Sequence, residues 1–139
     1  DQLVCVARKA HPRFQGALTQ DQYFNEKHII FKMRRYNLSV ADLLTKHVLP
    51  ARNMHSEQSS ILSMMSVASK SDALAIASKA YTDEYADLFG LQVFDLPFAA
   101  EPIEYYMVWS HKLEQNPANI WLRKQLNLAI KLKGLAVAV

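Results

Sequence analysis

Residues 52–79 read RNMHSEQSSILSMMSVASKSDALAIASK and decide how we interpret the fold. Their pattern predicts, in order, a short extended segment, a serine-rich turn, an apolar helix, a tight turn and a small apolar strand. Four apolar side chains of the helix recur at the spacing of one helical face, namely Ile61, Met64, Met65 and Ala68. The ALAIA run at 73–77 is apolar throughout, which predicts a strand that is covered on both faces. A strand, a helix and a second strand in succession are typical of an α/β sheet.

The same alternation extends in both directions along the chain. Apolar runs predict further strands at residues 3–7, 28–31, 91–96 and 103–109. Helices are expected after side chains that can cap a free N–H group, which are Thr19, Ser39, either Ser56 or Ser59, Ser78 and Asn116. This alternation predicts an α/β sheet with mostly parallel strands and with helices on its faces.

Length and composition exclude several classes of protein. The 139 residues suffice for one domain, or for one lobe of a two-lobed protein with pieces of the other. Three glycines and no GxGxxG or GxxxxGK pattern argue against a nucleotide-binding loop. A single cysteine excludes a disulfide framework and fits a reducing cytoplasm. The net charge of +3 is typical of a solvated surface. No apolar run approaches the roughly 18 residues of a membrane span. The chain enters a strand directly after Asp1, so we expect a piece of a longer protein.

Four segments, in this order, resemble the effector-binding domain of LysR-type transcriptional regulators. They are LVCVARKAHPRFQGALT at 3–19, SVASKSDALAIASK at 66–79, LQVFDLPF at 91–98 and YYMVWSHKLEQNPANIWLRKQL at 105–126. Lys70 and Asp72 stand where members of that family usually carry glycine, and Ser78 or Lys79 where proline is common. The chain therefore resembles a divergent branch of the family.

The resemblance implies a type 2 periplasmic-binding-protein-like lobe with a mixed, mostly parallel sheet flanked by helices. Residues 17–102 would form the second regulatory lobe, and residues 1–16 and 103–139 a remnant of the first. In that family a winged helix-turn-helix reads DNA and a two-lobed domain senses a small molecule. Because this chain contains no helix-turn-helix candidate, contact with DNA would be made by a domain outside it.

Effectors of that family bind in the cleft between the two lobes. Carried over by position, the residues expected to bind the effector are Lys32, Met33 and Arg34 after the second strand, and His55, Ser56, Glu57 and Gln58 before the central helix. A ligand carboxylate is one chemistry that fits, because free N–H groups at a helix start and an arginine both bind carboxylates. Glu57 would repel such an anion unless it turns away or binds an amine of the ligand.

Other functions are less well supported by the residues. Cys5 has no base placed beside it by the sequence, and the serines lack a nucleophile-elbow context. His47, His55 and Glu57 lack the spacing of metal ligands. We therefore expect no catalytic residue, metal or cofactor, and no association with a membrane. The alternatives are a lobe of a solute-binding protein and a dimerisation module without ligand sensing. Self-association is expected, because an incomplete first lobe would expose apolar surface.

Overall fold

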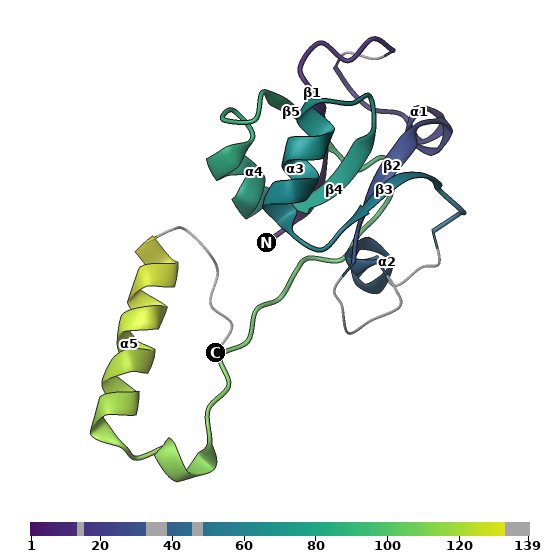
Figure 1. Cartoon of the computed structure of the whole chain (residues 1–139). Helices are drawn as coiled ribbons and strands as arrows, with labels where there is room; N and C mark the ends of the chain where they lie inside the picture. Colours follow the sequence, from purple (N-terminus) through teal and green to yellow (C-terminus); the bar gives the residue numbers. More distant parts are fainter. Residues whose placement is uncertain (14–15, 33–38, 46–48, 133–139) are drawn as a thin grey trace. The chain divides into compact units, whose positions relative to one another are not determined.

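The computed structural model describes residues 1–13, 16–32, 39–45 and 49–132 of the chain. The chain forms two compact units, Asp1–Ile103 and Glu104–Val139. The first unit contains a five-stranded sheet with helices on it, and the second contains a 3₁₀ turn and one long helix (Figure 1). No described helix is long and apolar enough to cross a membrane.

The sheet of the first unit is mixed. Its strands are β1 (Leu3–Arg8), β2 (Lys27–Phe31), β3 (Asn53–Gln58), β4 (Leu74–Ser78) and β5 (Leu91–Asp95). Their order across the sheet is β3-β2-β4-β1-β5. β2 is parallel to both β3 and β4, whereas β1 is antiparallel to β4 and β5. All the strands except β1 therefore run in one direction, which confirms the prediction of a mixed, mostly parallel α/β sheet.

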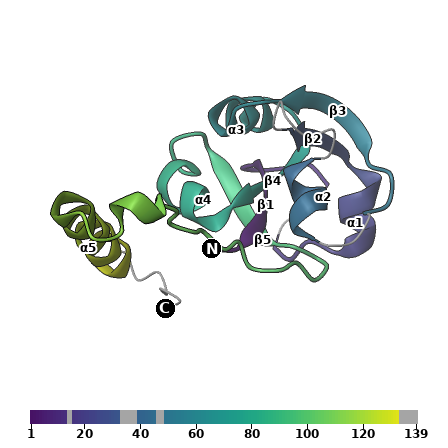
Figure 2. The same ribbon diagram turned by 90° about the horizontal axis from the view of Figure 1, so that it is seen from below.

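The helices of the first unit are α1 (Gln20–Asn25), α2 (Val40–Leu44), α3 (Ile61–Ser69) and α4 (Lys79–Tyr85). Helices lie on both faces of the sheet (Figure 2). Both faces are buried, which explains why the inner strands β1 and β4 are mostly apolar. Along β1, Val6 packs into the cluster that contains Met64 and Met65 of α3. Its neighbour Cys5 packs into the opposite cluster, which contains Tyr23 of α1. The predicted apolar face of α3 is thus part of the core.

The starts of α1 and α2 follow the predicted capping signals, whereas Ser78 precedes α4 without a capping hydrogen bond from its side chain. Thr19 forms a capping box with Gln22 at the start of α1, and Ser39 accepts a hydrogen bond from Asp42 N. The cap of α3 is Ser60, so the prediction of Ser56 or Ser59 was wrong. The reason is that β3 continues to Gln58 and moves the turn further along the chain.

The strand predicted at residues 103–109 does not form, because residues 99–110 contain no regular secondary structure. Ile103 donates one backbone hydrogen bond to Asp1 O (2.7 Å) and accepts another from the Asp1 amino group (2.9 Å). The first unit ends at Ile103, and no described strand pairs with the residues that follow it. An apolar run without a partner strand stays irregular.

β1 lies between β4 and β5, so it shares a sheet with strands of the segment predicted to form the second lobe. The boundary found in the structure falls after Ile103. The assignment of residues 1–16 and 103–139 to the first lobe of a longer protein stays a prediction.

A buried histidine of β2 contacts α1, and a mostly buried arginine before β3 contacts α2. His28 is only 1% exposed, and its Nε2 lies 2.9 Å from Tyr23 O. Arg52, with a side chain that is 9% exposed, donates to Asp42 Oδ1 (2.6 Å) and Ser39 Oγ (3.1 Å). Arg52 therefore ties the segment before β3 to the first turn of α2.

The second unit contains the 3₁₀ helix η1 (His111–Leu113) and α5 (Pro117–Leu132). Asn116 accepts a hydrogen bond from Asn119 N, as its predicted capping role requires. The Arg123 guanidinium lies 4.3 Å from the centre of the Trp109 ring and donates to Glu114 O. This stacking and hydrogen bond fix the irregular segment before η1 to the first half of α5.

Candidate functional site

The carboxyl ends of β2 and β3 bring part of the predicted effector site together. Because the two strands are parallel, Phe31 pairs with Gln58 and both strands end at the same edge of the sheet. Lys32 N donates to Gln58 O (2.9 Å), and Lys32 Nζ lies 2.7 Å from Glu57 Oε2. Lys32, Glu57 and Gln58 are therefore neighbours. Met33 and Arg34 lie outside the described residues.

The ion pair between Lys32 and Glu57 changes the electrostatics expected for this edge. The glutamate was expected to repel an anionic ligand. Since the two side chains pair with each other and stay partly exposed, their charges largely compensate. A ligand that separates them gains a donor and an acceptor together, so a molecule carrying both an acidic and a basic or amide group fits this edge.

Helix α3 begins directly beyond this edge. Ser60 accepts a hydrogen bond from Ser63 N at 3.5 Å, which is long for such a bond. The first-turn N–H groups of an α-helix lack partners inside the helix. Beside Gln58, α3 therefore presents backbone donors and the exposed hydroxyl-bearing residues Ser59 and Ser60.

Ser56 and His55 do not join the group at the carboxyl ends. Ser56 pairs with Ile29, which lies in the core beneath α3, and its Oγ is buried without a hydrogen-bond partner among the described residues. The register shifts at the preceding position, where His28 pairs with Met54 and Ile29 with Ser56. His55 is thus the extra residue of a β-bulge, a feature that redirects a side chain.

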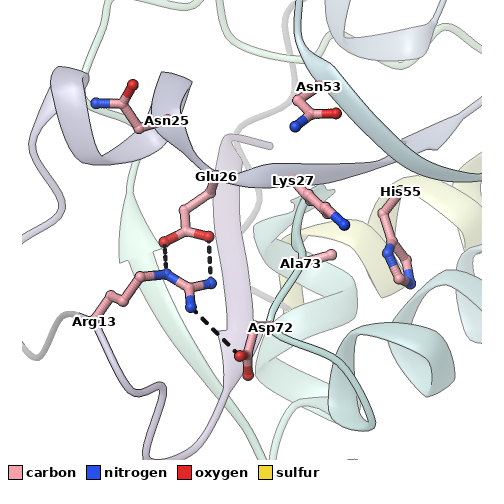
Figure 3. A pocket seen from close by; sticks show the side chains of 8 residues that line it. All are labelled: Arg13, Asn25, Glu26, Lys27, Asn53, His55, Asp72 and Ala73. Carbon is pink, nitrogen blue, oxygen red and sulfur yellow. Dashed lines mark hydrogen bonds and ion pairs between the residues drawn. The ribbon is translucent and has the colours of Figure 1, made fainter.

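The His55 side chain lines a different pocket at the amino ends of β2, β3 and β4 (Figure 3). This pocket has a volume of about 550 Å³. Its lining residues are Arg13, Asn25, Glu26, Lys27, Asn53, His55, Asp72 and Ala73. Sequence reasoning missed all of them as site residues except His55, because they come from four separate segments. The one local signal was the group of polar residues at 25–28.

One side of this pocket is built from paired charges. Arg13 donates from Nε and Nη2 to the two carboxylate oxygens of Glu26, whose side chain is 9% exposed. Arg13 Nη1 lies 3.5 Å from Asp72 Oδ2, and Arg8 Nε lies 2.6 Å from Asp72 Oδ1. The hydrogen bond from Arg8 lowers the pKa of Asp72, and the hydrogen bond to Glu26 raises the pKa of Arg13. The Asp72 carboxylate therefore stays ionised at neutral pH, and both carboxylates are paired with arginine side chains.

No cluster of three or more histidine, cysteine and carboxylate side chains suited to a metal ion occurs in the described part of the chain. Cys5 is fully buried, and this burial raises the pKa of its thiol well above the usual range. A thiol in that state is a poor nucleophile.

Comparison with known proteins decides the family. The model of the LysR substrate binding domain matches residues 1–129. The chain belongs to this family. Among its relatives, the LysR-type domain is 27% identical over 126 residues to the HTH-type transcriptional regulator LeuO of Escherichia coli K12, and this match covers 91% of the chain. It is 26% identical over 121 residues to the HTH-type transcriptional activator NahR of Pseudomonas putida, covering 87% of the chain.

The chain spans 40% of the length of LeuO and 40% of the length of NahR. Among solved structures, it superposes on the regulatory domain of MexT, a transcriptional activator in Pseudomonas aeruginosa, with a TM-score of 0.71. That match covers 91% of this LysR-type domain and 62% of the MexT chain at 21% identity, so it supports the fold alone. The periplasmic-binding-protein-like α/β fold predicted from the sequence is therefore confirmed.

Proposed function

We propose that this chain is the effector-sensing domain of a LysR-type DNA-binding transcriptional regulator. It binds a small molecule at the carboxyl ends of β2 and β3, and this binding modulates transcription. The observation that carries the proposal is the family match over residues 1–129, with relatives that are transcriptional regulators. The sheet supports the location, because open α/β sheets bind ligands beyond the carboxyl ends of their strands.

The effector wall of this proposal consists of Lys32, Glu57 and Gln58, together with Met33 and Arg34. Lys32 and Glu57 offer one donor and one acceptor 2.7 Å apart. Arg34 would supply the positive charge that the paired Lys32 lacks, and its planar guanidinium suits a carboxylate. The effector class that we propose is therefore a small carboxylate that also carries an amine or amide group.

The second wall of the cleft belongs to a lobe that this chain does not complete. A ligand that touches both walls favours the closed arrangement, because it binds that arrangement more tightly than the open one. DNA would be bound by a separate domain of the longer regulator, which we place in the cytoplasm. Sensing then consists of a shift between two arrangements of the lobes.

We also propose that the domain self-associates through β3 and α3. β3 is an edge strand of the sheet, so the backbone groups on one of its sides are unpaired by any described strand. Met54 on β3 is 59% exposed and Leu62 on α3 is 47% exposed. A dimerisation module is thus an additional role for the same domain, and light scattering that gives a monomer at high concentration would argue against it.

The proposed effector site is tested by calorimetric titration of small carboxylates into the complete two-lobed regulatory domain. For a ligand that binds, Lys32→Gln and Arg34→Ala should each weaken the affinity about tenfold, which is about 1.4 kcal/mol. The matched control is Lys79→Gln, because Lys79 also has one ion pair, to Asp83, and lies outside the proposed site. Unchanged affinity in both site variants would remove this edge from the effector site.

A further inference from the structure

We propose that the pocket at the amino ends of β2 and β3 is a second ligand site, which binds a small anion through Lys27, Asn53 and His55. It is separate from the proposed effector edge, since β2 and β3 run in the same direction and their two ends lie at opposite edges of the sheet. Binding at this pocket does not depend on whether the effector edge binds a ligand.

The three side chains are brought together by strand pairing. Lys27 pairs with Asn53 in the register of the two parallel strands, so both residues start their strands side by side. His55 follows two residues later and lines the same pocket. In Figure 3 the Lys27 side chain lies between the Arg13–Glu26 pair and the His55 ring, and Ala73 lies next to Lys27. A ligand in the pocket can therefore reach an ammonium, an imidazole and an amide.

The bulge at His55 is a second, independent feature of this wall. In a regular parallel ladder each residue of β3 would face a residue of β2, but His55 is skipped between the pairs His28–Met54 and Ile29–Ser56. Bulges are uncommon between parallel strands and are concentrated at sheet edges and beside functional sites. Here the bulge lies on the edge strand β3, at a residue that lines the pocket.

The charges around the pocket favour an anion. Glu26 and Asp72 are the acidic residues of the lining, and each is held by an arginine, Glu26 by Arg13 and Asp72 mainly by Arg8. Within the described residues, the side chains of Lys27, Asn53 and His55 have no ion pair or hydrogen bond. The lining therefore offers one uncompensated positive charge and two further groups able to donate hydrogen bonds.

The chemistry fits one phosphate or one carboxylate group on a small molecule. A lysine binds either group as a point charge, while the imidazole and the amide donate to separate oxygens. A volume of about 550 Å³ lies within the range of small-molecule sites, so the anionic group can carry a further polar portion. Asn25 is a further polar residue of the lining.

The test is a titration of the isotope-labelled 139-residue chain, followed by two-dimensional amide NMR spectra. Inorganic phosphate and succinate are the two probes, and ionic strength is held constant with sodium chloride. We expect saturable shifts of the Lys27, Asn53 and His55 amides. Lys27→Gln and His55→Gln should each weaken the binding at least about fivefold, and Lys79→Gln, which removes an equal charge elsewhere, should leave it unchanged. Each variant should fold, because the substituted side chains are exposed. Spectra that overlay with those of the unmodified chain outside the pocket would show this.

Each outcome decides the proposal. Saturable binding of phosphate alone assigns the site to phosphorylated small molecules, and binding of succinate alone assigns it to carboxylates. Shifts that rise linearly without saturation, or that are equally reduced in Lys79→Gln, would mean unspecific ionic effects and overturn the proposal. Saturable shifts that cluster at other residues, or no binding of either probe, would also overturn it.

Discussion

The substitution His28→Gln should remove most of the pH dependence of folding stability between pH 7 and pH 5. His28 is buried between β2 and α1, with its ring 4.5 Å from the ring of Tyr23. Burial is the main cause that lowers the pKa of His28 from 6.5 to about 4. The positive charge of Arg52 acts in the same direction, and the hydrogen bond to Tyr23 O and the charge of Glu26 oppose it. The folded chain therefore keeps this imidazole neutral at a pH where the unfolded chain protonates it.

The sign of the effect follows from proton binding in the two states. Between pH 6.5 and pH 4 the unfolded chain binds more protons at His28, so stability falls as the pH falls. With these two pKa values, the free energy of unfolding drops by about 2 kcal/mol from pH 7 to pH 5, and by about 3 kcal/mol once the pH is below 4. Asp72 does not contribute in this window, because its lowered pKa makes its share of stability disappear only at more acidic pH.

Urea unfolding followed by circular dichroism at pH 7 and pH 5 measures this difference. A loss of about 2 kcal/mol corresponds to a fall of roughly 1–2 M in the urea midpoint at usual slopes for a small protein. His55→Gln is the matched control, because it makes the same substitution at an exposed histidine outside the core. If the free energy of unfolding falls by the same amount between pH 7 and pH 5 in His28→Gln and in the unmodified chain, the reasoning is refuted.

Two further substitutions test the packing and the ion pairs. Met64→Ala should lower the free energy of unfolding by about 2–5 kcal/mol, because Met64 is fully buried on the inner side of α3. Leu62→Ala, on the exposed side of the same helix, should lower it by less than about 1 kcal/mol. Arg13→Gln should lower the free energy of unfolding by about 1–3 kcal/mol, because it leaves the buried Glu26 carboxylate without its main partner. A change smaller than the error of a denaturant titration would show that water replaces the guanidinium.

Most of the fold could be predicted from the sequence because it is set by local signals. Thr19, Ser39 and Asn116 start helices as their side chains predict, since a cap needs only the next three residues. The apolar stripe of α3 and the run in β1 identify buried elements, because periodicity reports which faces leave water.

The errors arose where distant residues decide the structure. The segment at 103–109 has the composition of a strand, but no described strand pairs with it, and pairing is not encoded in the segment itself. β3 extends to Gln58 because β2 supplies partners as far as Phe31, so the cap of the next helix moved to Ser60.

Only part of the grouping at the candidate site could be predicted, because part of it depends on residues that are distant in the sequence. Lys32, Glu57 and Gln58 meet because parallel strands end at one edge, which the order of strands along the chain implies. His55 was assigned to that group from its position in the sequence. Its side chain instead lines the pocket at the amino ends of β2 and β3, which is built by residues from four separate segments, and no local pattern shows that pocket.

The measurement that tests the proposed sensing function most directly is ligand mapping by NMR on the complete regulatory domain. Small carboxylates that carry amine or amide groups would be titrated into the isotope-labelled domain. Our account predicts saturable shifts at the amides of Lys32, Glu57 and Gln58, which are abolished in the Lys32→Gln, Glu57→Gln double variant. A ligand that binds this double variant with unchanged affinity, or whose shifts leave the ends of β2 and β3 unaffected, would contradict it.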